Sequence, residues 1–320
     1  MVRKDGRGGD AAAAAVAHSA PSQNPWQESA VAQLKLGLPK GSLEDATIEL
    51  FRKAGWKIRV HSRNYYPSID DPELSCALVR AQEMARYVEN GTLDCGLTGL
   101  DWILENQSQV VEVADLIYSK ASSKPARWVL AVAGDSPYQT LEELKGKRIS
   151  TELLNFTRRY FAERHVEVEV EFSWGATEAK VVEGLVDAIV EITETGSTIK
   201  AHGLRIIHEL LTTNTKLIAN PRAWADPVRR AKIEQIALLL KAALAAEGMV
   251  GLKLNVAEAN LEAVVALLPS LRAPTVSSLY KSDWYSVEAM VRENVVRDLM
   301  PKLLAAGAEG IVEYPLTKMV

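Results

Sequence analysis

Residues 185–199 read Leu-Val-Asp-Ala-Ile-Val-Glu-Ile-Thr-Glu-Thr-Gly-Ser-Thr-Ile. The apolar run at 185–190 predicts a buried strand. The small and polar residues after it predict a turn, and a short helical segment then runs to Gly203. A strand, a small-residue turn and a helix in this order point several backbone N–H groups at one anion. The stretch therefore predicts an α/β fold with an anion site.

The side chains of this turn favour a phosphorylated sugar as the anion. Thr195, Ser197 and Thr198 offer hydroxyl donors, while Glu191 and Glu194 offer acceptors for a sugar diol. Taken alone, the segment fits an ordinary strand-to-helix loop with capping residues equally well, because such loops are common.

Composition excludes several classes of protein. The 320 residues are 48% hydrophobic and 24% charged, and the net charge of -4 gives no overall basic field for a nucleic-acid partner. Cys76 and Cys95 are too few for a disulfide framework or a zinc site. No apolar run approaches the roughly 20 residues of a membrane helix. We expect a cytoplasmic protein of about two domains.

Residues 1–31 differ from the rest of the chain and predict a disordered tail. Gly, Ala, Ser, Pro and Gln dominate this segment. Its basic start and the alanines at 11–15 superficially resemble a targeting sequence. The apolar part is too short and too weakly hydrophobic for a signal peptide.

From Leu34 onward, strand and helix signals alternate. A strand at 34–38 leads to a helix that Ser42 caps, with Asp45 completing a capping box, and that ends at Gly55. Further helices are expected at 82–89, 140–146, 155–163 and 177–183, and further strands at 93–97 and 166–172. This alternation predicts α/β architecture with a largely parallel sheet.

A short internal sequence repeat indicates two similar lobes. Residues 89–94 and 183–187 each place a helix end, a glycine and an aspartate before an apolar strand. Two such lobes would hold a ligand in the cleft between them. For Asp187 we expect a structural role, in which the carboxylate satisfies backbone N–H groups at a strand entrance. The same role is the alternative for Asp94.

The pattern changes near Asn220-Pro221. Asp226 and Pro227 predict the start of a helix that runs to Glu247. The elements expected after it are strand 250–254, helix 257–268, strands 275–279 and 284–291, helix 293–306 and strand 310–314. This β-α-β-β-α-β order predicts a ferredoxin-like fold, so we assign residues 226–320 to a separate C-terminal domain.

Several motifs in this order resemble the long form of the ATP phosphoribosyltransferase family. They are Leu-Pro-Lys-Gly-Ser-Leu at 38–43, Leu-Asp-Cys-Gly-Leu-Thr-Gly at 93–99, the loop at 191–199, and the segments 273–276, 282–284 and 310–316. The resemblance covers about residues 33–320. It implies a catalytic part at 32–225 that is similar to periplasmic solute-binding proteins, and an ACT-like regulatory domain at 226–320. The predicted lobes are lobe I at about 32–120 plus 205–222 and lobe II at about 121–204.

The resemblance also implies a reaction. The family joins N1 of ATP to C1 of phosphoribosyl pyrophosphate with Mg²⁺ and releases pyrophosphate, as the first step of histidine biosynthesis under feedback inhibition by histidine. Adenine N1 carries a free lone pair, so the site needs no strong base. Positioning two polyanions and stabilising an oxocarbenium-like centre are the harder tasks. The family also implies dimers that assemble into hexamers. The metal ligands stay open.

The resemblance assigns roles to individual residues. Phosphoribosyl pyrophosphate is expected to bind at Glu191, Glu194, Thr195, Gly196, Ser197, Thr198 and Ile199. ATP is expected to bind at Lys40, Gly41, Arg80, Asp94, Thr98 and Gly99. The expected catalytic residues are Glu191, which would accept from the ribose hydroxyls, and Lys40. Without the resemblance, Lys40 fits a solvated lysine and Arg80 a surface ion pair. Glu152 fits either the active site or a helix-terminal charge.

Two positions depart from the family pattern. Many relatives have Asp where Glu191 stands and Arg where Ser197 stands. The longer acid still reaches a ribose diol, whereas the missing Arg removes a charge-assisted phosphate contact. We therefore expect a weaker phosphate grip or a substitute cation.

Histidine, the implied inhibitor, is expected to contact five residues of the last domain: Asn255, Leu271, Thr275, Met290 and Gly310. Asn255 and Glu258 also fit a capping box, and Leu271 and Met290 also fit core positions. The five histidines of the chain show no ligand spacing, and we assign none a catalytic role.

Two other functions stay open at this point. A small-molecule sensor could use the same two-lobed fold without chemistry. A salvage enzyme that transfers phosphoribose to a nucleobase is the second, although such enzymes usually carry two adjacent acids before the loop. Here Ile192 and Thr193 separate Glu191 from Glu194.

Overall fold

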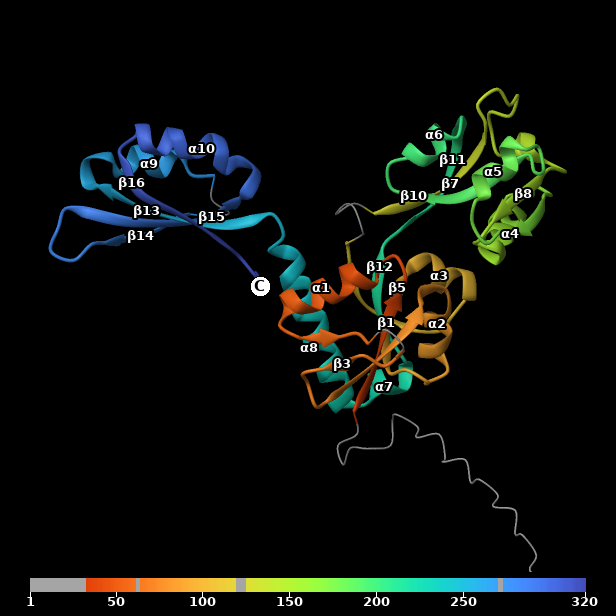
Figure 1. Cartoon of the computed structure of the whole chain (residues 1–320), viewed down its shortest axis with the longest axis horizontal. Coiled ribbons are helices and arrows are strands. Elements are labelled where there is room, and N and C mark those ends of the chain that lie inside the picture. Colours follow the sequence, from red (N-terminus) through yellow and green to blue (C-terminus); the bar gives the residue numbers. More distant parts are fainter. Residues whose placement is uncertain (1–32, 62–63, 119–124, 270–272) are drawn as a thin grey trace, which may run out of the picture.

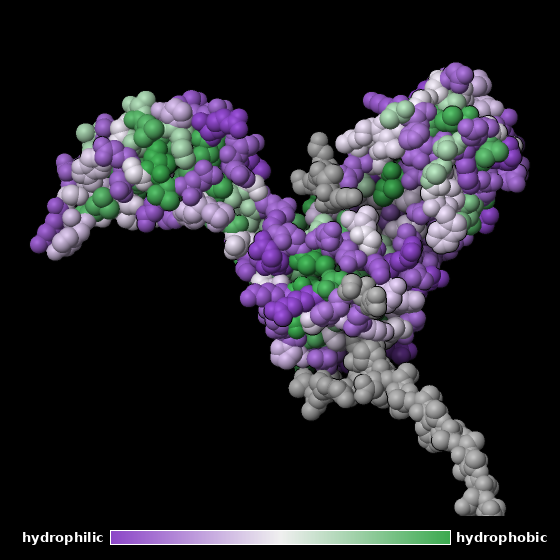
Figure 2. Space-filling view, viewed as in Figure 1, coloured by the Kyte–Doolittle hydropathy of each residue, from purple (hydrophilic) through white to green (hydrophobic). Residues whose placement is uncertain are grey.

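The computed structural model describes residues 33–61, 64–118, 125–269 and 273–320. It contains two mixed five-stranded sheets, one antiparallel four-stranded sheet and a two-stranded ribbon, the last formed by β2 (Ile58–Arg59) and β3 (Ser68–Ile69) (Figure 1). The predicted tail at 1–31 lies outside the described residues. Hydrophilic residues cover most of the face in Figure 2, and hydrophobic residues form separate patches on it.

The first lobe is built on the sheet β4-β1-β5-β12-β6. Its strands are β1 (Leu34–Lys40), β4 (Leu74–Arg80), β5 (Cys95–Gly99), β6 (Val111–Leu116) and β12 (Thr215–Ala219). Because β1 pairs in parallel with both β4 and β5, the carboxyl ends of these three strands lie at one edge of the sheet. Lys40, Arg80 and Gly99 end the strands there.

Helices cover both faces of this sheet. On one face lie α1 (Glu44–Ala54) and α8 (Pro227–Ala245), which share a core with the strands that contains Phe51, Ile236 and Leu240. On the other face lie α2 (Ala81–Glu89) and α3 (Leu100–Asn106). Gly37 and Gly96 let α2 approach, because a Cβ at either would lie within 3 Å of the Met84 sulfur, at 2.3 and 2.6 Å.

The second lobe is built on the sheet β11-β7-β10-β8-β9. Its strands are β7 (Ala126–Ala133), β8 (Arg148–Thr151), β9 (Glu169–Phe172), β10 (Ala188–Thr193) and β11 (Leu204–Thr213). Its helices are α4 (Leu154–Glu163), α5 (Thr177–Val182) and α6 (Ser197–Ala201), with a 3-10 turn at Glu142–Leu144. The chain crosses between the lobes twice, from β6 to β7 and from β11 to β12 (Figure 1).

The C-terminal sheet has the order β14-β15-β13-β16, with every pairing antiparallel. Its elements are β13 (Met249–Ala257), a 3-10 turn at Glu258–Asn260, α9 (Leu261–Leu267), β14 (Thr275–Ser278), β15 (Trp284–Arg292), α10 (Glu293–Ala305) and β16 (Ala308–Pro315). The element order is the predicted one. Helices α9 and α10 pack on one face and bury Leu252, Leu254 and Val287 there.

Two connections join this C-terminal sheet to the first lobe. The first is α8, which ends just before β13 and whose buried side chains belong to the first core. The second is the chain end after β16, where Met319 N donates to Ala242 O and Lys318 Nζ donates to Ala54 O at 3.1 Å. Figure 1 shows the C-terminus next to α1 and α8. The predicted boundary at residue 226 stays a prediction.

Several predicted elements have other bounds or caps. Ser42 caps no helix, because α1 begins at Glu44 with Leu43 at its N-cap position and no side-chain cap. The expected helix at 140–146 is only a 3-10 turn. The strand expected at 185–190 lies at 188–193, after Asp187. Asn255 and Glu258 form no capping box, because the turn at Glu258–Asn260 has Ala257 as N-cap and no side-chain cap.

Other predictions are confirmed. Asp226 caps α8, accepting from Val228 N at 2.9 Å and Arg229 N at 3.2 Å, with Pro227 at the first helical position. Asp187 accepts from Arg148 N at a strand entrance. The predicted largely parallel sheet is wrong in part, because β7, β11 and β12 pair antiparallel with their neighbours. None of the helices in the described part of the chain has the length and apolar composition of a membrane span.

Asn220 joins three segments of the first lobe. Its Oδ1 caps α7 (Pro221–Ala225), and its Nδ2 donates to the carbonyls of Val88 and Glu89 at the end of α2. We predict that Asn220→Ala lowers the free energy of unfolding by about 2 kcal/mol, because a buried cap and two carbonyl partners are lost together. Urea unfolding measures the loss. Asn90→Ala, at an exposed asparagine of the same junction, is the matched control, and an equal loss in both variants would contradict the prediction.

Candidate active site

A cleft of about 820 Å³ lies between the two lobes. Its volume falls within the roughly 300–1,000 Å³ of small-molecule sites. The first lobe contributes Lys40, Gly41, Ser42, Arg80, Gln82, Gly99, Asp101 and Trp102, the second contributes Trp128, Glu152, Ile192, Thr193, Glu194, Thr195, Ser197 and Thr198, and the two crossings contribute Tyr118, Thr213, Asn214 and Thr215. Segments distant in the sequence therefore meet in one site.

Two cations stand at the first-lobe side of the cleft. Lys40 and Arg80 are partners in the parallel register of β1 and β4, so strand pairing places them next to each other. Both are exposed, and Lys40 Nζ lies 3.9 Å from the centroid of the Tyr65 ring. A flexible ammonium beside a planar guanidinium suits a polyphosphate.

The loop that follows β10 forms the opposite side. Gly196 has a φ of +78°, which favours glycine, and its N–H donates to Thr193 Oγ1 at 2.8 Å. Thr195 Oγ1 donates to Ser197 Oγ at 2.9 Å, so the hydroxyls of the loop are ordered among themselves. Thr193, Thr195, Ser197 and Thr198 all line the cleft. The loop presents small donors without a cation at position 197.

Glu191 lies on β10 but is not among the residues that line the cleft. Burial raises the pKa of its carboxyl to about 7; a hydrogen bond with Thr177 lowers it, and the charges of Glu178 and Glu152 raise it further. The predicted contact of Glu191 with ribose stays a prediction.

Four further predicted residues lie away from the cleft lining. Asp94 is at the far end of β5, where it accepts from Lys35 N at 2.8 Å and pairs with Arg229 at 2.6 Å. This is the structural role that its counterpart Asp187 plays in the second lobe. Thr98 Oγ1 donates to Ala81 O, Gly196 turns the loop, and the Ile199 side chain is fully buried in the core. Their predicted ligand contacts stay untested.

Sequence reasoning missed several residues of the cleft. Asp101, Trp102 and Trp128 line it, although no motif pointed to them. Glu152, for which the sequence left the active site and a helix-terminal charge open, also lines the cleft, directly after β8. Burial raises the pKa of Glu152, and the charge of Asp101 raises it too, whereas Arg80 opposes both effects.

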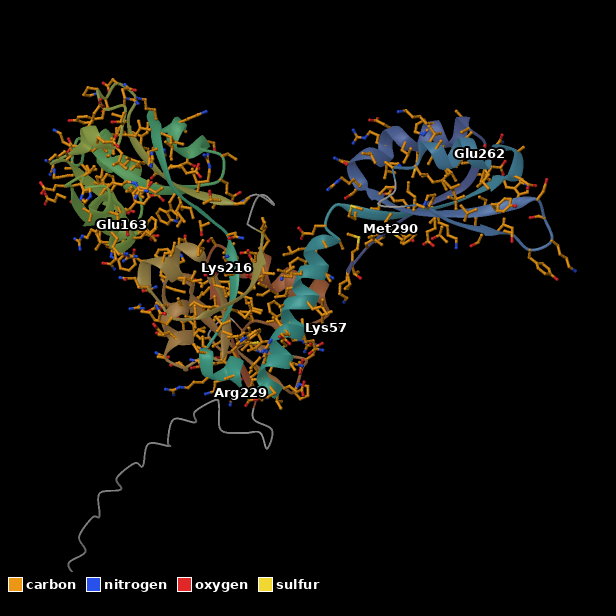
Figure 3. All side chains as sticks on the ribbon, turned by 180° about the vertical axis from the view of Figure 1, so that it is seen from behind. Lys57, Glu163, Lys216, Arg229, Glu262 and Met290 are labelled. Atoms are coloured by element: carbon orange, nitrogen blue, oxygen red, sulfur yellow. The ribbon has the colours of Figure 1, made fainter. Side chains whose placement is uncertain are left out.

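In the C-terminal sheet, the predicted inhibitor residues gather on the face that α9 and α10 leave open. Asn255 and Met290 alternate with the buried residues of β13 and β15, and Thr275 is the partner of Glu288, two residues before Met290. A Cβ at Gly310 would lie 3.6 Å from Asn255 Nδ2. Figure 3 shows Met290 at the sheet and Glu262 on α9, away from that face. Leu271 lies outside the described residues.

On the same face, the ring of Tyr314 occupies space that is free only because residue 251 is a glycine. A Cβ at Gly251 would lie 2.1 Å from the Tyr314 ring, and the Tyr314 hydroxyl donates to Glu288. The ring therefore lies flat across β13, next to the cross-strand partner of Gly251, Met290.

Comparison with known proteins decides the family. The model described as "ATP phosphoribosyltransferase" matches residues 80–242, and the model described as "HisG, C-terminal domain" matches residues 246–318. An ATP phosphoribosyltransferase from Solidesulfovibrio magneticus is 68% identical over 287 residues, which cover 90% of this chain and 98% of that protein. The chain belongs to the ATP phosphoribosyltransferase family. It is a transferase of the first step of histidine biosynthesis with a regulatory C-terminal domain.

Further relatives agree. The ATP phosphoribosyltransferase of Desulfatibacillum aliphaticivorans is also 68% identical over 287 residues, 90% of this chain and 98% of that protein. A solved structure titled as the ATP phosphoribosyl transferase (HisG:HisZ) complex from Thermotoga maritima matches with a TM-score of 0.56 and 26% identity, over 65% of this chain and 99% of that chain. The two lobes have α/β architecture, each built on a mixed five-stranded sheet. Membership in the family excludes the sensor and the nucleobase-salvage enzyme.

The raised pKa of Glu191 implies that the free energy of unfolding depends on pH. The ionised form is disfavoured in the folded state, so stability falls as the pH rises from the unfolded pKa of 4.5 through the folded pKa of about 7. We compare the free energy of unfolding of Glu191→Gln with that of the parent. We predict that the difference favours the variant by on the order of 2–3 kcal/mol more at pH 8 than at pH 4. Urea unfolding at both pH values measures the difference, with Glu163→Gln on the exposed end of α4 as control. A pH-independent difference would contradict the assignment.

Proposed function

We propose that this cleft binds ATP and phosphoribosyl pyrophosphate together and transfers the phosphoribosyl group to N1 of adenine. The loop at 193–198 would hold the 5-phosphate of the donor, and Lys40 and Arg80 would meet the triphosphate of ATP. One observation supports the proposal most: two cations on one lobe face a hydroxyl-rich loop on the other, in a chain of this family.

The reaction needs little proton chemistry. The lone pair of adenine N1 forms the new bond to ribose C1, while the bond between C1 and the pyrophosphate oxygen breaks and pyrophosphate leaves with the electron pair. Positive charge builds up at C1 in the transition state. Glu152 and Glu194 line the cleft and would stabilise this charge, while Lys40 and Arg80 would offset the phosphates. The lobes would hold the two substrates in line.

Mg²⁺ fits this cleft as an ion carried by substrate. No cluster of three metal-ligating side chains occurs in the residues that the structure describes, so a site made by protein ligands alone has no support there. Mg²⁺ typically takes one or two carboxylates together with substrate phosphates, and Glu152 and Glu194 are hard oxygen donors of this kind. When bound, the ion would neutralise the leaving pyrophosphate.

The donor loop would bind phosphate without the arginine that many relatives have. Its backbone N–H groups and the hydroxyls of Thr195, Ser197 and Thr198 would supply the contacts, aided by the cations across the cleft. Because Glu194 lines the cleft and Glu191 does not, we infer that Glu194 is the nearer acceptor for the ribose diol.

A steady-state assay tests the transfer. We predict that the protein with ATP, Mg²⁺ and phosphoribosyl pyrophosphate releases pyrophosphate and forms phosphoribosyl-ATP. Arg80→Ala should lower kcat/KM about 100-fold, because hydrogen bonds to charged groups contribute about 1.5–3 kcal/mol each. Arg86→Ala, at an exposed arginine of α2 that pairs only weakly with Glu83 at 3.8 Å, is the matched control. No pyrophosphate from the parent, or equal losses in both variants, would refute the proposal.

For regulation, we propose that the open face of the C-terminal sheet binds histidine. Asn255, Thr275 and Met290 lie on this face, and Gly310 lies beside Asn255. The amide of Asn255 and the hydroxyl of Thr275 suit the amino and carboxyl groups of a free amino acid. Assembly into dimers and hexamers stays a prediction from the resemblance, and a cytoplasmic location stays a prediction from the composition.

A mutation tests the regulatory face. We predict that Asn255→Ala weakens inhibition by histidine at least tenfold and leaves kcat unchanged, because it removes polar contacts far from the cleft. Inhibition curves at fixed substrate concentrations measure this. The control is Glu262→Ala on α9, at the covered side of the sheet (Figure 3). Unchanged inhibition of the Asn255 variant would place the inhibitor elsewhere.

A further inference from the structure

The short helix α3 belongs to the first lobe but contacts the second. Ile103 is buried in the first-lobe core beside Met84 and Val88. Trp102, the residue before it, packs instead against the core of the second lobe, where its ring lies 6.3 Å from the Trp128 ring at 88°. One helix therefore places neighbouring side chains in two different cores.

A buried carboxylate on α3 also reaches the second lobe. Asp101 is 3% exposed and accepts from Trp128 Nε1 at 2.8 Å and from Trp102 N at 3.0 Å. Its own N–H donates to Thr213 Oγ1, at the point where the chain returns to the first lobe. A buried carboxylate is tolerated only where donors satisfy it. Separation of the lobes would remove the Trp128 donor and leave this charge poorly satisfied.

One turn after Asp101, Glu105 caps a helix of the other lobe. Its two carboxylate oxygens accept from Asn155 N at 2.9 Å and Phe156 N at 2.7 Å, the backbone donors of the second and third residues of α4. The N-cap residue of α4, Leu153, supplies no side-chain cap of its own. In return, Arg159 of α4 donates to the carbonyl of Leu104 on α3. The local sequence of α4 thus lacks a cap that the first lobe provides.

We propose that Asp101, Trp102 and Glu105 form an inter-lobe clasp that holds the cleft in its reactive arrangement, with Asp101 and Glu105 as positioning residues. Asp101, Trp102 and Trp128 line the same cleft as Arg80 and Glu152, which come from different lobes. The clasp would therefore fix the position of the ATP side relative to the donor side. The positioning role depends on the function proposed above, whereas the mechanical role does not.

A distance measurement tests the mechanical role without substrate. Lys57 and Glu163 are exposed and lie on different lobes (Figure 3), while the native Cys76 and Cys95 are buried, so a Lys57→Cys/Glu163→Cys pair can carry two spin labels. We expect one narrow distance distribution in the parent pair. Adding Glu105→Ala should broaden it and populate opened forms about tenfold more, as expected for the loss of a helix cap. Adding Glu83→Ala, at an acid of α2 that pairs with Arg86 of the same helix, should leave it unchanged.

Kinetics test the positioning role. Substrates that bridge the lobes would have to close the cleft first, so Glu105→Ala should raise KM for phosphoribosyl pyrophosphate about tenfold and change kcat less than twofold. Glu105→Gln keeps one acceptor and should recover part of the loss. Loss of thermal stability alone would not raise KM while leaving kcat nearly unchanged. Equal distance distributions in the parent and in Glu105→Ala would overturn the clasp, even if the protein made no phosphoribosyl-ATP. Changed distances with an unchanged KM would overturn its positioning role.

Discussion

The parallel pairing of β1 with β4 is the constraint on which the cleft depends. Its register makes Lys40 and Arg80 partners at the carboxyl ends of two strands, so no further element is needed to bring the cations together. The buried partners Leu36 and Cys76 fix the same register from within the core. A slip of one residue would turn the buried side chains of β1 away from α1 and α8. The hydrophobic core thereby determines where the charged groups stand.

The second lobe repeats this construction with a different chemistry. Its parallel strands β8 and β10 end in Thr151 and Thr193, followed by Glu152 and by the hydroxyl-rich loop. At the opposite ends of the sheets, Asp94 and Asp187 each accept a backbone N–H of a neighbouring strand. The sequence pattern that the two lobes share therefore has the same structural role in both, at the start of a strand. The lobes differ at their carboxyl ends, which carry cations in one lobe and acids and hydroxyls in the other.

Local patterns predicted the parts of the fold that local physics decides. Asp226 with Pro227 marked the start of α8, and the loop around Gly196 marked a turn before a short helix. The strands that cross between the lobes were missed because β7 and β11 pair with each other over sequence distances that a local pattern does not contain. Asp101 and Glu105 were missed for the same reason: their partners, Trp128 and α4, belong to the other lobe. The ATP role expected for Asp94 came from a motif whose aspartate sits at the far end of its strand.

The return of the chain end to α8 and α1 has a mechanical consequence. With the link through α8 at one side and Lys318 and Met319 at the other, the C-terminal sheet is anchored to the first lobe at two places. With two attachment points, the sheet can rotate about the line that joins them, but its other rigid-body motions relative to the first lobe are restricted. A rotation of the sheet would therefore displace the end of α1, where Lys318 contacts Ala54. A peptide fused after Val320 would begin next to Lys318 and Met319, the residues that make these contacts.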